Sequence, residues 1–315
     1  MKIVSLLPSA TEIVCSLGLE KELLAITHEC DFPTSIRHLP AITASRISHA
    51  SMTSKEIDHA VRGQLDGHGS IYDLDTQLLE RLKPDLILTQ ELCDVCAVSY
   101  KQVERAAKMY VADATVVSLE PNNIEDIFAT ILTVGELAGA KARATNVVAK
   151  LRGRLDAVRE KTAVVEQHPK VFMLEWLEPP FSPGHWVPEQ VEVAGGMALL
   201  GEPGERSVTT TYEAIRTSQP DAMVLIPCGY YTADTLRQVE NTVFPENWTD
   251  IPAIKNNEVW ALDATSYFSR PGPRIVDGVE ILAKIIHPAI FGEPKPMEAI
   301  RVDRASLRFA AAVSS

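Results

Sequence analysis

The sequence predicts an α/β fold in which two Rossmann-like lobes with parallel sheets are joined by one long helix. Residues 1–122 and 168–292 each alternate short apolar runs with stretches of helical periodicity, a pattern typical of parallel sheets covered by helices. The segments RLKPDLILT (Arg81–Thr89) and TSQPDAMVLI (Thr217–Ile226) both read as a helix end, Pro-Asp and a buried strand. We therefore expect the same unit once in each lobe.

The joining helix is predicted over residues 123–167, which contain no proline. Apolar residues recur with helical spacing from Ile124 to Val158, which indicates one long helix or two nearly continuous ones. The expected domains are an N-terminal lobe over 1–122, this helix, a C-terminal lobe over 168–292 and a loosely ordered tail over 293–315.

In the N-terminal lobe, Pro8 ends the first strand, and Ser9 with Glu12 forms a capping box for the first helix. Elsewhere, proline and glycine residues and the ends of apolar periodicity mark the boundaries of the predicted strands and helices. The predicted strands cover residues 2–7, 23–27, 86–89 and 114–119, and the helices cover 10–17, 54–64, 74–82 and 99–109. In the C-terminal lobe, strands are predicted at 171–174, 221–226 and 258–262, and helices at 188–194, 212–217, 232–242 and 272–287.

The stretch from Pro169 to Gly196 organises the C-terminal lobe. A buried strand, Val171–Leu174, is followed by a loop that carries two tryptophans, a phenylalanine and a histidine among prolines. Rigid aromatic side chains on a loop suit contact with a flat ligand, because each ring buries a large apolar area at little entropic cost. The alternative is that the tryptophans pack back into the core.

Composition excludes several classes of function. Hydrophobic residues make up 46% and charged residues 23%, as in ordinary globular proteins, and the net charge of −12 argues against nucleic acid and anionic membrane surfaces as partners. No apolar run predicts membrane insertion. Because Met1–Leu7 lacks the features of a secretory signal, the chain as written is predicted to be cytoplasmic; an upstream N-terminus would make it extracytoplasmic.

Five motifs occur in order between Lys2 and His287: LLPSATE, CDFP, LKPDLIL, PPFSPGHW with EVAGG, and YFSRPGPRI. Together they resemble the helical-backbone (class III) family of periplasmic-type substrate-binding proteins, and within it the cobalamin-binding branch. The resemblance implies a ligand held in the cleft between the lobes, by loops at the carboxyl ends of the strands. Because a single helix resists bending, we expect only a small cleft change on binding.

Carried over motif by motif, the resemblance implies a set of ligand-binding residues on these loops. They are Pro8, Ser9, Glu12, His28, Cys30, Phe32, Glu91, Glu175, Trp176, Phe181, His185, Trp186, Tyr267, Phe268 and Arg270. Tyr230 joins this set as a further aromatic residue suited to a corrin or porphyrin. The acidic members favour cobalamin, which carries amides, over haem, which carries carboxylates.

Four further side chains on two of these loops resemble metal ligands. His28, Cys30, Cys93 and Cys96 make up a Cys3His set of the kind that binds zinc. The alternatives are a redox dithiol at Cys93 and Cys96, axial coordination of a bound cobalt by His28, or reduced thiols without metal. An odd total of five cysteines does not indicate a disulfide framework.

We therefore predict non-catalytic binding of cobalamin or a related corrinoid, by an ABC-transporter-type solute-binding protein or a cytoplasmic relative. The sequence contains no P-loop, glycine-rich dinucleotide motif or Ser-His-Asp pattern. The expected partners are a small tetrapyrrole-like ligand and an ABC transporter permease or a corrinoid-handling protein. Two alternatives remain: a thiol- or metal-dependent enzyme that uses Cys93 and Cys96, and a siderophore- or haem-binding protein.

Overall fold

The structure is a computed structural model that describes residues 1–45, 52–66, 72–90 and 100–310. The chain divides into two compact units. Unit 1 comprises residues 1–52, 56–121 and 125–150, and unit 2 comprises residues 53–55, 122–124 and 151–315.

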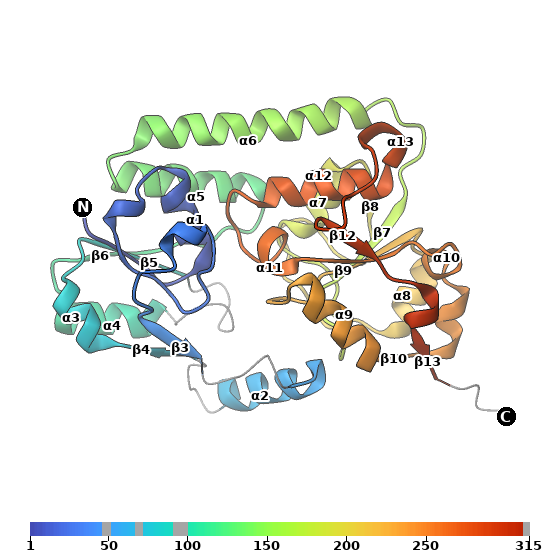
Figure 1. Cartoon of the computed structure of the whole chain (residues 1–315), viewed down its shortest axis with the longest axis horizontal. Coiled ribbons are helices and arrows are strands. Elements are labelled where there is room, and N and C mark those ends of the chain that lie inside the picture. Colours follow the sequence, from blue (N-terminus) through green and yellow to red (C-terminus); the bar gives the residue numbers. More distant parts are fainter. Residues whose placement is uncertain (46–51, 67–71, 91–99, 311–315) are drawn as a thin grey trace. The chain divides into compact units, whose positions relative to one another are not determined.

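A four-stranded parallel sheet forms the centre of unit 1, with the strand order β2-β1-β5-β6 (Figure 1). The strands are β1 (Ile3–Ser5), β2 (Leu23–Ala25), β5 (Leu86–Thr89) and β6 (Thr115–Ser118). Val4 pairs with Ile87, which pairs with Val116. All four strands are short, and β1, β5 and β6 are rich in β-branched residues, as parallel strands often are.

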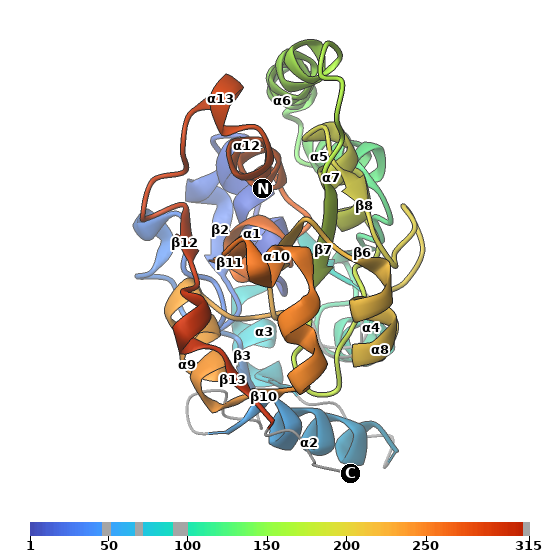
Figure 2. The same cartoon turned by 90° about the vertical axis from the view of Figure 1, so that its right-hand side faces the viewer.

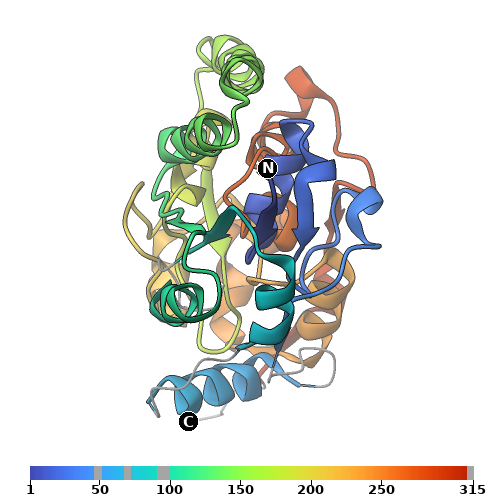
Figure 3. The same ribbon diagram turned by 90° about the vertical axis from the view of Figure 1, so that its left-hand side faces the viewer.

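Helices cover both faces of this sheet (Figures 1 and 3). The elements are α1 (Pro8–Ser16) and α5 (Ile124–Leu137) on one side, and α3 (Thr76–Leu82) and α4 (Tyr100–Tyr110) on the other. Val4 and Ile87 form a core with Leu79 of α3 and Val103 of α4. Unit 1 also contains η1 (Glu20–Glu22), η2 (Thr34–Ile36), the antiparallel pair β3 (Thr43–Ser45) and β4 (Tyr72–Leu74), and most of α2 (Ser54–Asp66).

The main sheet of unit 2 has five strands in the order β12-β11-β9-β7-β8. They are β7 (Lys170–Leu174), β8 (Met197–Ala198), β9 (Ala222–Leu225), β11 (Val259–Leu262) and β12 (Ala299–Arg301). All neighbours pair in parallel except β12, which lies antiparallel to β11 at the edge.

Alternate residues of these strands face two helical layers (Figure 2). Phe172 and Leu225 pack in one core with Trp248 and Ile215, on the side of α8 (Tyr212–Ser218), α9 (Thr232–Asn241), η3 (Glu246–Asp250) and α10 (Pro252–Lys255). The other face is covered by α7 (Val187–Val193) and α12 (Ile275–Ile286). The remaining elements are α11 (Ala264–Tyr267), α13 (Pro288–Phe291), η4 (Arg304–Ser306), and the parallel pair β10 (Val243–Phe244) and β13 (Arg308–Phe309).

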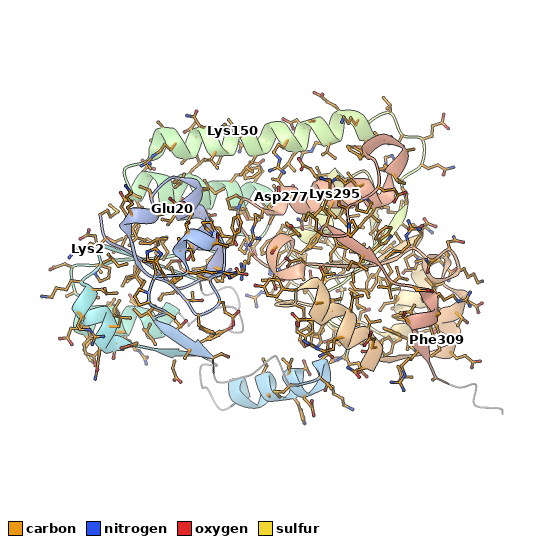
Figure 4. The ribbon with its side chains drawn as sticks, in the orientation of Figure 1. Lys2, Glu20, Lys150, Asp277, Lys295 and Phe309 are labelled. Carbon is orange, nitrogen blue, oxygen red and sulfur yellow. The ribbon has the colours of Figure 1, made fainter. Side chains whose placement is uncertain are left out.

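The stretch predicted as one long helix or two nearly continuous ones instead forms two separate helices, α5 and α6 (Lys141–Thr162), which pack side by side, so the prediction of a continuous helix is wrong (Figure 1). Gly139, with a φ of +67°, lies in the turn between them, where left-handed backbone favours glycine. The boundary between the units lies within α6, after Lys150. On the unit 2 side, Arg154 donates to Asp277 of α12 (labelled in Figure 4) and to Glu280 at 2.5 and 2.8 Å.

Two local predictions are wrong. The helix α1 begins at Pro8 after Leu7, without a side-chain cap, so Ser9 and Glu12 form no capping box there. Proline fits the first helical turn because its missing N–H would be unpaired in any case. The segment after Glu293 is not a loose tail up to Ala310, because β12 extends the main sheet and β13 pairs with β10.

Among the residues that the structure describes, none of the helices combines the length and apolar character that a membrane span requires.

Contact between α5 and α6 in unit 1 depends on Gly135, where a Cβ atom would lie 2.3 Å from the Ala144 Cβ. We expect Gly135→Val to destabilise the protein by about 2 kcal/mol, because the helices must separate. Gly153→Ala is the matched control, since a Cβ at this position in α6 meets no atom within 4 Å. It should stabilise the protein by about 0.5–1 kcal/mol through helix propensity. Urea denaturation measures both; equal stability of the two variants would contradict the packing.

Candidate functional site

The candidate site in unit 2 lies where the strand order reverses. From β7 the chain proceeds to β8 on one side, whereas β9 and β11 lie on the other. The carboxyl ends of β7 and β9 therefore flank the switch point at which open α/β sheets generally bind ligands. Glu175 and Trp176 follow β7, and Tyr230 follows β9.

An aromatic pair occupies this position. The rings of Trp176 and Tyr230 meet edge to face with their centroids 5.4 Å apart. Thr265, after β11, donates its backbone N–H to the Tyr230 carbonyl at 3.2 Å. The Trp176 Nε1 and Thr265 Oγ1 atoms are buried, and neither has a hydrogen-bond partner within the part of the chain that the structure describes. Since buried polar atoms are nearly always paired, these two atoms make this a candidate ligand-binding position.

The second tryptophan of the loop is used differently. Trp186 is 6% exposed, and its indole N–H donates to the carbonyl of Phe268 at 2.8 Å, while Phe268 itself is 2% exposed. Both residues therefore pack inside unit 2. The alternative that the tryptophans fill the core thus describes Trp186, whereas Trp176 keeps partial exposure.

His185 and Phe181 are partly buried on the same loop. His185 has a φ of +52°, and its ring centroid lies 5.6 Å from that of Trp186. Burial, followed by the nearby Arg206 guanidinium, lowers the pKa of His185, so the imidazole is neutral near pH 7. The main chain of Phe181 bridges Trp176 and Thr209.

Glu175 anchors the start of this loop. Its carboxylate accepts a hydrogen bond from the Gly184 N–H at 3.1 Å and a second, short one from the Ser207 hydroxyl. Although the residue keeps some surface exposure, protein atoms surround the carboxylate. The resulting loss of hydration raises the pKa of Glu175 to about 7, against the lowering effect of both donors.

Tyr267, Phe268 and Arg270 follow β11. Tyr267 is partly buried, with a pKa raised mainly by loss of hydration, and Arg270 is 6% exposed. Gln190 of α7 fixes this segment, because its Nε2 donates to the carbonyls of Tyr267 at 3.1 Å and Ile275 at 2.8 Å. Gln190 and Thr265 are not among the residues predicted from the sequence. A polar residue on the apolar face of α7 was the available signal for Gln190.

The corresponding position in unit 1 follows β1, at the switch point between β1 and β5. Pro8 begins α1 there and is partly buried, while Ser9 is 3% and Glu12 4% exposed. Thr11 lies behind them: its hydroxyl donates to the Ser5 Oγ at 2.9 Å and is 3.1 Å from the Cys30 Sγ.

The loop after β2 holds the remaining described candidates of unit 1. The Nδ1 of His28 is 2.8 Å from the Thr43 hydroxyl, and its ring centroid lies 5.5 Å from that of Tyr72. Phe32 is 44% exposed. Glu91, Cys93 and Cys96 lie outside the described residues.

The zinc hypothesis receives no support. Within the described ranges, no three His, Cys, Asp or Glu side chains are grouped so as to hold a metal ion. His28 and Cys30 instead contact the hydroxyls of Thr43 and Thr11.

Comparisons with known proteins agree with this architecture. Residues 3–265 match the family model described as periplasmic binding protein. The chain is 26% identical to the uncharacterized ABC transporter substrate-binding lipoprotein YvrC of Bacillus subtilis, over 93% of this chain and 82% of that one. It is 22% identical to the vitamin B12-binding protein of Vibrio cholerae, over 89% and 86% of the chains. Among solved structures, a periplasmic heme binding protein from Pseudomonas aeruginosa superimposes with a TM-score of 0.70, at 18% identity over 96% and 99% of the chains.

These comparisons confirm the α/β fold and the family resemblance expected from the sequence. The predicted cytoplasmic location is wrong, because the relatives are a lipoprotein of an ABC transporter and periplasmic binding proteins. That prediction was drawn from the first seven residues, Met1–Leu7, which are too small a basis for assigning a compartment.

The Glu175 carboxyl group should make stability depend on pH. Its pKa is about 7 in the folded protein against an ordinary 4.5, so the folded state binds more protons between these values. Its contribution is therefore fully present below about pH 4.5 and is lost as the pH rises through about 7; the shift corresponds to at most on the order of 3 kcal/mol. Glu175→Gln, which stays uncharged, should flatten this part of the curve of unfolding free energy against pH. An unchanged slope in the variant would contradict this assignment.

Removing the Gln190 amide should destabilise unit 2. Gln190→Leu leaves the carbonyls of Tyr267 and Ile275 without that donor, and we expect a loss of about 2 kcal/mol in urea denaturation. Glu192→Leu makes the matched change at an exposed position of the same helix and should shift stability by no more than about 0.5 kcal/mol. Similar losses in both variants would show that Gln190 has no special role.

Proposed function

The chain belongs to the periplasmic binding protein family, and we propose that within this family it binds cobalamin or a related corrinoid. It is a solute-binding protein of the ABC-transporter type. The relatives are substrate-binding proteins and not enzymes, as the sequence predicts.

The partly exposed Trp176 ring, which packs edge to face on the buried Tyr230, is the observation that carries the proposal. It lies at the switch point of the unit 2 sheet, beside the buried Trp176 Nε1 and Thr265 Oγ1 atoms, which have no hydrogen-bond partner among the described residues. Aromatic faces suit the apolar surface of a large ring ligand, and nearby donors suit acceptor groups at its periphery. Cobalamin and related corrinoids present both features.

One comparison favours a corrinoid over haem. The Vibrio cholerae relative is named for vitamin B12, and it aligns with most of this chain. The Pseudomonas aeruginosa structure, named for heme, makes haem the ligand against which the proposal must be tested.

An ABC transporter permease is the proposed partner, as the description of the Bacillus subtilis relative suggests. The proposed ligand-binding residues of unit 2 are Trp176, Phe181, His185 and Tyr267, with Glu175, Trp186, Tyr230, Phe268 and Arg270 supporting them from inside the unit.

Absorption and calorimetric titrations of the purified protein with cyanocobalamin, haemin and a ferric siderophore test the ligand. We expect saturable binding of cyanocobalamin that is tighter than binding of haemin. Tighter binding of haemin or of the siderophore, or no retention of cobalamin on desalting, would overturn the proposal.

Trp176→Ala should weaken cobalamin binding by about 2 kcal/mol, roughly thirtyfold, since large aromatic residues dominate binding surfaces. Tyr110→Ala removes an aromatic side chain, 39% exposed, at the end of α4 and should leave affinity unchanged. Equal affinities of both variants would remove Trp176 from the site.

A further inference from the structure

Glu175 is held in place by its own main chain. Its N–H donates to the Phe181 carbonyl at 3.2 Å, and its carbonyl accepts from the N–H of Cys228, after β9, at 3.1 Å. The main chain of Glu175 is thus held by its own loop and by the segment after β9, which fixes the point from which its side chain extends.

The carboxylate joins two loops, the aromatic loop (residues 175–187) and the partner loop (residues 204–209). Gly184 belongs to the first and Ser207 to the second, and both donate to the carboxylate. A Cβ at Gly184 would lie 2.1 Å from the Ser207 nitrogen, so the two backbones meet directly above the carboxylate.

Main-chain hydrogen bonds continue this contact on both sides. Ser182 donates to the Val208 carbonyl at 2.9 Å, His185 donates to the Glu205 carbonyl at 2.5 Å, and Gly204 donates to the His185 carbonyl at 2.8 Å. The conformation of the aromatic loop, and with it the placement of Trp176 and Phe181, therefore depends on a contact centred on Glu175.

Among the described residues, the Gly184 N–H and the Ser207 hydroxyl donate to this carboxylate. Negative charge on the Cys228 side chain, from the β9 side, further raises its pKa. The other ionisable side chains on the two loops are Glu178, His185, Glu205 and Arg206. His185 is itself neutral near pH 7, and the Arg206 charge acts on His185.

Both protonation states fit the site. The ionised carboxylate accepts from Gly184 and Ser207. When a proton from water binds the oxygen facing Ser207, that oxygen can donate to the Ser207 hydroxyl, which acts as donor or acceptor, while Gly184 still donates to the other oxygen. Protonation therefore requires no rearrangement of the loops.

We propose that Glu175 is a positioning residue that holds the aromatic loop against the partner loop, and that ligand binding beside Trp176 adds a proton to its carboxyl group. This rests on the proposed function. A ring ligand placed over Trp176 replaces water outside the aromatic loop with apolar surface, which disfavours the charged form of Glu175 even though protein atoms already surround its carboxylate. By linkage, the complex takes up a proton, and the ligand binds more tightly at lower pH.

The test measures cyanocobalamin affinity by calorimetry from about pH 6 to about pH 9, in buffers with different heats of ionisation. A one-unit rise of the Glu175 pKa on binding makes binding about tenfold tighter at the lower pH, with proton uptake visible as a buffer-dependent enthalpy. Glu175→Gln mimics the protonated form and should bind at all pH values as tightly as the wild type does at low pH, without proton uptake.

Glu205→Gln is the matched control, because it removes an exposed carboxylate from the partner loop and should keep the wild-type pH profile. Ser207→Ala removes a hydrogen bond that lowers the pKa of Glu175, so it should move the pH-dependent loss of affinity to higher pH. Binding by the wild type without proton uptake, or with uptake unchanged in Glu175→Gln, overturns this inference alone. No binding of cobalamin by the wild type overturns the proposed function as well.

Discussion

Parallel pairing of β7 with β9 is the constraint on which the candidate site depends. Val171 pairs with Ala222 and Leu174 with Leu225, so both strands end at the same level. The residues directly after Leu174 must therefore lie beside the residues directly after Leu225. This register brings Trp176 to the Tyr230 ring and joins the Glu175 carbonyl to the Cys228 N–H. Because β8 lies on the opposite side of β7, these two loops are not covered by a crossover between them.

Burial at this sheet end has opposite effects on different side chains. The Trp186 indole has a carbonyl partner and becomes part of the core, whereas the buried Trp176 Nε1 has no hydrogen-bond partner among the described residues. Glu175 retains two donors yet loses hydration, so its carboxyl group titrates near neutrality. A binding surface needs both kinds of residue: satisfied groups that hold the loops still, and unsatisfied groups that a ligand can complete.

The fold was predictable wherever apolar periodicity and helix-ending residues agree. The strand predicted at Leu86–Thr89 has these bounds in the structure, and the Pro-Asp repeat precedes both β5 and β9. The predictions that are wrong concern features outside such windows. The strands β12 and β13 have only three and two residues, too few to show a period. Their pairing partners also lie far away in the sequence: Trp260 pairs with Arg301, 41 residues on, and Val243 with Arg308, 65 residues on. The capping box predicted for α1 is wrong because Pro8, and not the residue after Ser9, begins the helix. The spacing of the sequence alone does not decide between these two starting points.

The candidate site was predictable as a set of loops, but not as a set of roles. Trp176 and Trp186 are ten positions apart on one loop, and no local pattern separates them. What separates them is the Phe268 carbonyl, 82 residues beyond Trp186, which accepts the Trp186 N–H. Glu175 likewise resembles a ligand-contacting acid until Gly184 and Ser207 are brought to it. The role of each such residue depends on hydrogen-bond partners that only the fold supplies. An acidic or aromatic residue on a ligand loop is therefore best assigned to ligand contact or to support of the loop by asking which of its polar atoms already have a partner in the protein.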